Sequence, residues 1–276
     1  MRRYFRLSGG GNDFLALVEP NVAPGAEEIR DLCRRGLSAG ADGFFTLERR
    51  PDTVAMRYFN ADGRPAELCL NGTRCAIQLA RHLGWEENPL SIETGAGTFR
   101  GRSVDASTVA VDLPRPGTPE HHTLVEEDRR YEGWRLEVGV PHFVLPQDGT
   151  LATAPVSSLG PRLRRHDDWG NRGSNINFAR FVDAHHLEIR TFERGVEAET
   201  LACGTGVLAS VATGLEIGAL ELPVRALTLG GFHLEVDHGG SAEGESWSLT
   251  GDARLIAEGT LHPGALDLPP PPSWTP

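Results

Sequence analysis

The chain has 276 residues, of which 39% are hydrophobic, and this is enough to bury one large core or two medium-sized ones. Acidic residues outnumber basic ones by 38 to 27, the formal net charge is −11, and basic clusters are no longer than arginine pairs, so nucleic acid is not expected as a partner. The sequence shows neither an apolar run of about 18 residues nor an apolar signal segment at its start, so we expect no membrane association and a soluble, cytoplasmic protein.

Two segments of the chain share one pattern. In the first half, a strand-like stretch at 54–59 is followed by a turn-rich loop ending at Cys69 and by a helical run at 73–83. The second half repeats this order with a stretch at 187–192, a loop ending at Cys203 and a helical run at 207–215. Both loops contain Phe, Glu and Cys-x-x-Gly in the same order, about half a chain length apart. The pattern predicts an internal duplication in which each half presents one cysteine at the start of its own helix.

Short runs with alternating apolar residues follow each helix and predict strands, at 91–95, 109–113, 226–230, 233–236 and 247–250. Many short strands with one principal helix per half predict an α+β fold of two pseudo-symmetric domains, each a curled, mostly antiparallel sheet around a central helix. The polar stretch at 114–130 is the expected boundary. We therefore predict an N-terminal domain at 1–120, a C-terminal domain at 121–262 and an extended tail at 263–276.

The four cysteines are too few for a disulfide framework and are expected to be thiols: Cys33, Cys69, Cys75 and Cys203. We interpret Cys33 and Cys75 as core residues. A helix N-terminus lowers the pKa of a cysteine by placing backbone N–H groups beside the sulfur, so we expect this effect at Cys69 and Cys203. The glycines and short polar residues at 70–72 and 204–206 leave backbone amides free to face a carboxylate.

Two such loops are typical of one kind of chemistry. Inverting a stereocentre requires that one proton leave one face of a carbon and that another arrive on the opposite face. One thiolate and one thiol can do this, provided that dipoles aimed at the neighbouring carboxylate stabilise the carbanion. The sequence shows no pyridoxal-lysine motif, so Cys69 and Cys203 together predict cofactor-independent inversion of an amino acid.

Several motifs occur in a family-specific order: Gly11-Asn-Asp-Phe14, Phe59-Asn-Ala-Asp-Gly63, Cys69, Asn71-Gly-Thr-Arg-Cys75, Asn175-Ile-Asn-Phe178, Glu193-Arg-Gly195 and Ala202-Cys-Gly-Thr-Gly206. With them, the chain resembles the diaminopimelate epimerase family. Members of that family interconvert LL- and meso-diaminopimelate without a cofactor, in the synthesis of lysine and peptidoglycan precursors.

The resemblance implies the two-domain fold, with Cys69 and Cys203 as the proton-transfer pair and His142 and Glu193 as residues that tune the thiols. It also implies a set of substrate-binding residues: Asn12, Asn60, Leu70, Asn71, Asn175, Glu193, Arg194, Gly204 and Thr205. No metal and no other cofactor is expected. The expected partner is a small-molecule amino-acid substrate, and a homodimer is left open.

Three positions depart from the family pattern. Leu70 stands where a glycine usually follows the first cysteine, Gly43 where a glutamine follows Gly-Ala-Asp, and Val140 where an asparagine precedes Pro-His. Against these losses, the pair Glu193-Arg194 suits the distal ammonium and distal carboxylate of a diamino diacid, because arginine binds carboxylates with two parallel hydrogen bonds.

Other hypotheses stay open at this stage. The same chemistry could serve a racemase of another amino acid. A thiol hydrolase would use Cys203 as nucleophile and His142 as base, and a thiol-disulfide oxidoreductase would use both cysteines of the duplicated loops. A binding protein without activity is a further alternative. A zinc site from Cys69, Cys75 and His82 is disfavoured, because its spacing fits no common structural site.

Overall fold

A computed structural model describes residues 2–85, 89–240 and 246–269. The chain forms two compact units, Met1–Ser107 with Ala253–Pro276, and Thr108–Asp252. The first unit contains the strands β1 (Arg2–Gly9), β2 (Asn12–Val18), β3 (Gly43–Arg49), β4 (Val54–Asn60), β5 (Pro65–Ala66), β6 (Leu90–Thr94), β7 (Gly97–Ser103) and β18 (Arg254–Leu261). Its helices are α1 (Ala26–Cys33), α2 (Leu70–His82) and the short η3 (Pro263–Ala265).

The second unit contains the strands β8 (Thr108–Pro114), β9 (Glu120–Glu126), β10 (Arg129–Val138), β11 (Val140–Pro146), β12 (Asn175–Asp183), β13 (His186–Glu193), β14 (Ala198–Thr200), β15 (Val224–Thr228), β16 (His233–His238) and β17 (Ser246–Asp252). Its helices are η1 (Leu151–Thr153), α3 (Val156–Arg164), η2 (Asp167–Arg172) and α4 (Gly204–Glu216).

The two units repeat one topology, which confirms the predicted duplication. In the first unit, β1 to β2 is antiparallel, β2 to β3 parallel, β3 to β4 antiparallel, β4 to β6 parallel and β6 to β7 antiparallel. In the second, β10, β11, β12, β13, β15 and β16 pair with the same alternation of directions. The predicted α+β class with mostly antiparallel sheets is therefore confirmed.

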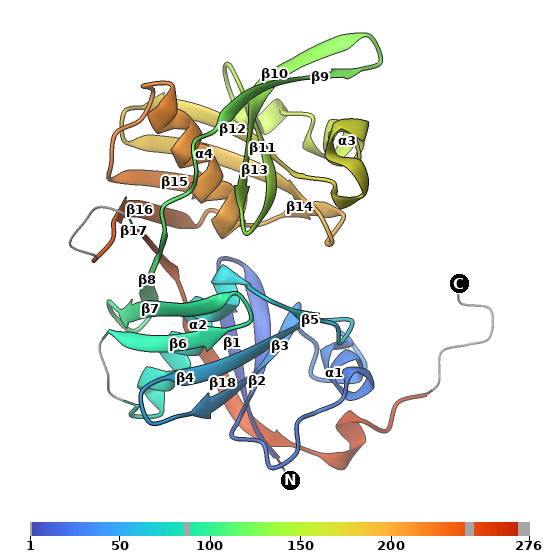
Figure 1. The fold of residues 1–276 in the computed structure, drawn as a ribbon. Coiled ribbons are helices and arrows are strands. Elements are labelled where there is room, and N and C mark those ends of the chain that lie inside the picture. Colours follow the sequence, from blue (N-terminus) through green and yellow to red (C-terminus); the bar gives the residue numbers. More distant parts are fainter. Residues whose placement is uncertain (1, 86–88, 241–245, 270–276) are drawn as a thin grey trace. The chain divides into compact units, whose positions relative to one another are not determined.

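Each unit surrounds one helix with its strands (Figure 1). The helix α2 contacts seven of the eight strands of the first unit, and α4 contacts β10–β13 and β16. Every residue of α2 from Leu70 to Ala80 is buried, and α4 is buried at nearly every position from Gly204 to Gly214. Small side chains in these helices let the strands approach from all sides, and the helices are therefore buried. The predicted central helix is therefore observed in each unit.

The unit boundaries differ from the predicted division at 1–120 and 121–262. Residues 108–114 belong to the second unit because β8 pairs with β17 along its whole length. Residues 254–261 belong to the first unit because β18 pairs with β1. The consecutive strands β17 and β18 thus complete different units, and alternation of apolar residues does not encode the partner of a strand. In the predicted tail, residues 263–265 form η3, and 270–276 lie outside the described residues.

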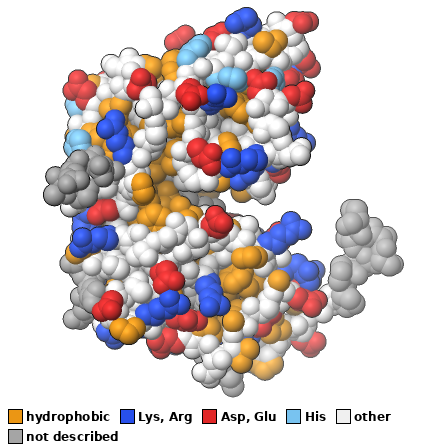
Figure 2. All heavy atoms as spheres, viewed as in Figure 1, with side chains coloured by type: hydrophobic (Ala, Val, Ile, Leu, Met, Phe, Trp, Pro, Cys, Tyr) orange, Lys and Arg blue, Asp and Glu red, His pale blue; other side chains and the backbone are white. Residues whose placement is uncertain are grey.

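The charged surface contains both signs. Figure 2 shows acidic and basic side chains interspersed over the displayed face. Ion pairs link charges of opposite sign in the described chain, as where Arg162 contacts both Glu126 and Glu127. Within the described ranges, no helix is both long and apolar enough to cross a membrane.

Candidate active site

The two cysteines of the duplicated loops occupy equivalent backbone positions. Cys69 immediately precedes α2 with an extended backbone (φ −138°, ψ 104°), and Cys203 precedes α4 in the same way (φ −119°, ψ 107°). The carbonyl of Cys69 accepts the first helical hydrogen bond from Thr73 N at 2.7 Å, and that of Cys203 accepts from Val207 N at 3.0 Å. Among the described residues, no side chain caps either helix. The predicted position of each cysteine at a helix start is confirmed, and the N–H groups of a helix N-terminus suit an anion.

A line of amide side chains leads away from the start of α2. Asn71 Nδ2 donates to Asn12 Oδ1 at 2.8 Å, and Arg74, which is fully buried, donates from Nη2 to Asn71 Oδ1 at 2.6 Å. Asn12 Nδ2 in turn lies 3.4 Å from Asp42 Oδ2. The amide groups of Asn12 and Asn71 are thus fixed in orientation.

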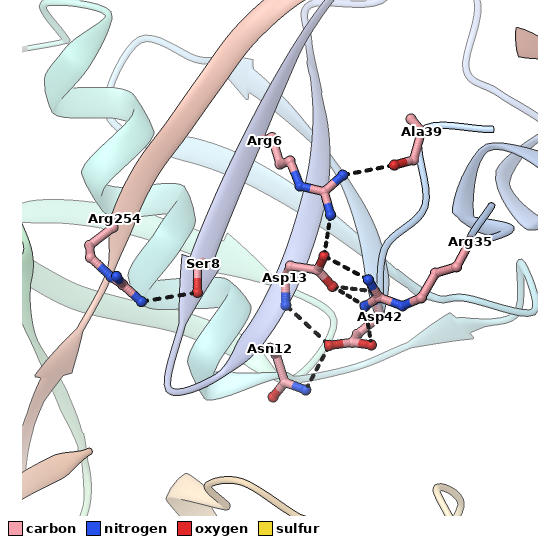
Figure 3. Close-up of polar contacts among 8 residues, drawn as sticks. All are labelled: Arg6, Ser8, Asn12, Asp13, Arg35, Ala39, Asp42 and Arg254. Carbon is pink, nitrogen blue, oxygen red and sulfur yellow. Dashed lines mark hydrogen bonds and ion pairs between the residues drawn. The ribbon is translucent and has the colours of Figure 1, made fainter. Parts of the chain in front are cut away.

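Figure 3 shows the charged network that supports Asn12. Arg35 donates to Asp42 Oδ1 at 2.7 Å and also to Asp13, and Arg6 donates to Asp13 from another direction. The backbone N–H of Asp13 donates to Asp42 Oδ2 at 3.1 Å, and that of Asp42 donates to Asp13 Oδ1 at 3.0 Å. Burial acts to raise the pKa of Asp13, but Arg35, the Asp42 amide and Arg6 lower it overall. The network ties the start of β2, where Asn12 lies, to the loop that precedes β3.

One neighbour of Cys69 was missed by the sequence reasoning. The side chain of Tyr58, on β4, packs beside Gly72 in the first turn of α2, and Cys69 is among the groups that act on its hydroxyl. Burial, followed by the charge and hydrogen bond of Cys69, raises the pKa of Tyr58 far above its usual value, so the phenol stays protonated. The only signal for Tyr58 in the sequence is its place in the strand-like stretch at 54–59. An isolated tyrosine in a strand is far more often a packing residue.

A different set of groups surrounds Cys203. Its thiol hydrogen-bonds the Glu193 carboxyl group, lies 3.5 Å from Thr205 Oγ1 and accepts from the Gly206 N–H. The Glu193 carboxyl group also accepts from the Thr200 hydroxyl. Burial raises the pKa of Glu193, although the hydrogen bonds of Thr200 and Cys203 oppose this rise. The site pairs a buried thiol with a buried carboxyl group.

The expected lowering of the Cys203 pKa is wrong. Burial, and then the Glu193 charge, raise the pKa of Cys203 well above its usual value, although the hydrogen bonds from Thr205 and Gly206 oppose this rise. The helix N-terminus is present as predicted, but desolvation of a thiolate that is 7% exposed outweighs it. Cys203 is therefore held as a neutral thiol.

The orientation of His142 is fixed by a buried chain of hydrogen bonds from Thr191 through Asn177, which we call the relay. Thr191 Oγ1 donates to Asn177 Oδ1 at 3.0 Å, and Asn177 Nδ2 donates to His142 Nδ1 at 3.1 Å. Burial lowers the pKa of His142 to about 3, so the ring is neutral and carries its proton on Nε2. This Nε2 atom is buried and has no hydrogen-bond partner among the described residues. A β-carbon on Gly206 would lie 2.4 Å from Asn177 Oδ1, so the relay requires the second glycine of Cys-Gly-Thr-Gly.

Arg194 lies in the loop after β13. Its backbone N–H donates to Asn175 Oδ1 at 2.8 Å, and its Nη1 donates to the carbonyl of Arg172 at 3.2 Å. It forms no ion pair with any other described residue. The guanidinium charge helps to lower the pKa of Glu137, which is ion-paired with Arg172, while the backbone of the loop is anchored by Asn175 independently of the side chain.

The predicted site residues form two sets, one in each unit. Cys69 has Asn12 and Asn71 near it, while the Leu70 side chain is buried in the core and Asn60 is exposed at the end of β4, opposite Gly43. The other set lies with Cys203 in the second unit: His142, Asn175, Glu193, Arg194, Gly204 and Thr205.

The remaining cysteine predictions can be compared directly. Cys33 and Cys75 are buried, which confirms them as core residues, and burial raises the pKa of Cys33 to about 12. Over the part of the chain that the structure describes, no three His, Cys, Asp or Glu side chains gather closely enough to hold a metal ion, so Cys69, Cys75 and His82 form no such group.

Comparison with known proteins decides the family. The profile of the family described as "Diaminopimelate epimerase" matches residues 4–115 and 135–256. The chain belongs to the diaminopimelate epimerase family. A curated relative of that name from Aquifex aeolicus is 34% identical over 281 residues, covering 96% of this chain and 99% of the relative. Another of the same name, from Methanothrix thermoacetophila, is 34% identical and covers 94% and 95%.

Solved structures show that the fold extends beyond the family. A phenazine biosynthesis protein of the PhzF family from Enterococcus faecalis superposes with a TM-score of 0.72 at 17% identity, covering 95% of this chain and 99% of that one. A probable proline racemase from Agrobacterium radiobacter K84 gives a TM-score of 0.70 at 15% identity, covering 96% of both chains. These likenesses establish the fold alone.

Proposed function

We propose that the protein catalyses the cofactor-independent epimerisation of LL-diaminopimelate to meso-diaminopimelate, with Cys69 and Cys203 as the two proton-transfer groups. One observation carries the proposal. In a chain of the diaminopimelate epimerase family, each half of the duplicated fold presents a cysteine at the uncapped N-terminus of a buried helix. The symmetry of the two half-sites matches a reaction that treats the two faces of one carbon alike.

The proton chemistry follows from the surroundings of each sulfur. Because Cys203 is held as a thiol, we assign to it the acid in one direction and to Cys69 the base. The Cα–H bond breaks, its proton forms an S–H bond with the Cys69 thiolate, and the electron pair stays on the carbon and its carboxylate. The Cys203 S–H bond then breaks and its proton joins Cα from the opposite face. The reverse reaction begins from the state in which Cys69 carries the proton.

The carbanion needs stabilisation, because the α-proton of an amino acid is very weakly acidic. The first-turn N–H groups of α2 and α4 are the groups suited to the substrate α-carboxylate. Fixed dipoles of this kind cost no reorganisation during the reaction. The oriented amides of Asn12 and Asn71 add hydrogen-bonding groups beside Cys69.

The amino-acid composition supports a mechanism without pyridoxal phosphate. All 27 basic residues of the chain are arginines, and the 276 residues contain no lysine. Pyridoxal phosphate acts in amino-acid racemisation through a Schiff base with a protein lysine, which this chain does not offer. The protein groups themselves must then provide both the proton transfers and the charge stabilisation.

Arg194 carries the substrate preference in this proposal. Its guanidinium forms no ion pair within 4.0 Å among the described residues and suits the distal carboxylate of a diamino diacid, although its charge also helps to lower the pKa of Glu137. Glu193 is engaged by Thr200 and Cys203, so we assign it to the thiol rather than to the distal ammonium. The preference for a dicarboxylate therefore rests on one residue that a single substitution can remove.

The proposal is tested by incubating the protein with LL-diaminopimelate and separating the stereoisomers by chiral chromatography, with alanine, ornithine, glutamate and histidine in parallel. We expect meso-diaminopimelate from the wild type and none from Cys69→Ser or Cys203→Ser. Preferred racemisation of a monocarboxylic amino acid would replace diaminopimelate by the alternative racemase. A cytoplasmic location and a homodimer stay predictions.

A further inference from the structure

The space beside Gly43 is filled by another residue of the same sheet. In the family pattern a glutamine follows Gly-Ala-Asp, but here the position is Gly43, at the first position of β3. A β-carbon at this residue would lie 2.6 Å from the Tyr58 hydroxyl oxygen and 2.8 Å from Tyr58 Cε2. No side chain other than that of glycine leaves room for Tyr58 in its present position.

The ring of Tyr58 is held on its other sides as well. It meets Phe14 edge-to-face, with ring centroids 6.2 Å apart and planes at 71°. A β-carbon on Gly72, in the first turn of α2, would lie 3.6 Å from Tyr58 Cδ2. The ring therefore lies between β3, β2 and the start of α2, the helix that Cys69 precedes.

The duplicated fold shows what the first unit lacks at this position. In the second unit, the first residue of β12 is Asn175, which is paired with His142 as Gly43 is paired with Phe14. Asn175 uses its side chain to hold the loop that follows β13. At Gly43 such a polar group is missing, and the Tyr58 hydroxyl from the neighbouring strand β4 occupies this space instead.

We propose that Tyr58 is a positioning residue for the proposed epimerisation, which donates a hydrogen bond from its phenol to the Cys69 sulfur in the space that Gly43 leaves open. The hydroxyl stabilises the thiolate and fixes its direction, because hydrogen bonds to a charged acceptor are the stronger ones. The inference rests on the proposed function for its catalytic meaning, but the hydrogen bond itself is testable on the thiol alone.

The phenol can serve as a permanent donor. Its pKa is far above the usual range through burial and through Cys69, with smaller contributions from Asp42 and Cys33, so it keeps its proton wherever Cys69 is a thiolate. The hydroxyl is then a hydrogen-bond donor in every step and never a competing base. Losing it should reduce the fraction of thiolate at a given pH by about tenfold to a hundredfold, a shift of about one to two pH units.

The first experiment measures the rate of iodoacetamide alkylation at Cys69 and Cys203 separately, by peptide mass spectrometry, from pH 5 to pH 10. We expect Tyr58→Phe to shift the Cys69 profile to higher pH by about one to two units and to leave the Cys203 profile in place. Tyr131→Phe, a matched substitution in the second unit, should shift neither. An unchanged Cys69 profile in Tyr58→Phe would overturn the proposal, whatever the activity of the protein.

A second variant displaces the hydroxyl without deleting it. Gly43→Ala should shift the Cys69 profile in the wild type, because its β-carbon occupies the place of the hydroxyl, but should add nothing in the Tyr58→Phe background. Additive shifts would show that Gly43 acts independently of Tyr58 and would contradict the inference. Thermal unfolding of each variant reports whether it folds.

Turnover supplies the remaining readout. For Tyr58→Phe we expect kcat with LL-diaminopimelate to fall about tenfold or more with little change in KM, and the pH optimum to move upward with the alkylation profile. A rise in KM with unchanged kcat would assign Tyr58 to substrate binding and overturn its role at the sulfur. If the wild type does not epimerise diaminopimelate at all, the proposed function fails, while the alkylation profiles still decide the role of Tyr58.

Discussion

Replacing Arg194 by methionine isolates the residue on which the substrate preference rests. Methionine keeps much of the apolar stem but removes the guanidinium. A carboxylate bound by two charge-assisted hydrogen bonds loses about 3–5 kcal/mol when its partner is truncated. At about 1.4 kcal/mol per factor of ten, kcat/KM for LL-diaminopimelate should fall by about two to four orders of magnitude.

The same substitution should leave the fold intact. The side chain contributes one described hydrogen bond, to the Arg172 carbonyl, whereas the loop is held through the backbone N–H of residue 194 by Asn175. Loss of one such hydrogen bond costs about 1 kcal/mol. For a chain of this size, this lowers the melting temperature by about 2–4 °C.

The assay compares kcat/KM for LL-diaminopimelate and for alanine in the wild type, in Arg194→Met and in Arg135→Met. Arg135 is a matched control, because it is an exposed arginine of the same unit that is paired with Glu120. The control should behave as the wild type. If Arg194→Met retains diaminopimelate turnover within fivefold, or loses activity on alanine to the same degree, the assignment of Arg194 to the distal carboxylate is refuted.

Two further predictions concern the relay around His142. Because its pKa is lowered to about 3, the unfolded chain takes up a proton below pH 6.5 that the folded chain refuses, so stability is intact above pH 6.5 and falls as the pH decreases toward 3. We measure the free energy of unfolding with urea at pH 7 and at pH 5. Between these two values it should fall by about 2 kcal/mol less in His142→Gln than in the wild type. Equal decreases would contradict the buried neutral ring. Gly206→Ala should cost about 1–3 kcal/mol of stability, because its β-carbon displaces Asn177, whereas Gly117→Ala, with open space around it, should cost little. Equal unfolding midpoints for these two alanine variants would argue against the close approach.

The features that the sequence predicted correctly are local ones. Cys69 and Cys203 are each followed by a glycine three positions later, and the start of each helix depends on this local segment. The repeated motif also predicted the duplication, because each half contains one copy with the same residues in the same order. Such signals require no knowledge of which strand lies beside which.

The features that the sequence could not give depend on distant neighbours. The strand β18 could have continued in the second unit, and only its pairing with β1 assigns it to the first. The pKa of Cys203 is raised by burial and by Glu193, and together they outweigh the lowering by the helix N-terminus. Gly43 was recognised as a departure, but the residue that fills its space, Tyr58, comes from the next strand of the folded sheet.

The two-base assignment of Cys69 and Cys203 is tested most directly by epimerisation of LL-diaminopimelate in deuterium oxide, followed at low conversion by mass spectrometry of the separated stereoisomers. In the two-base reaction, a thiolate takes the proton from one face of the carbon and a separate thiol delivers its hydrogen to the opposite face. We therefore expect meso-diaminopimelate with one deuterium at the inverted carbon. The remaining LL-diaminopimelate should still carry protium at that stage. A product without deuterium, or a substrate pool labelled as fast as the product, would contradict the account.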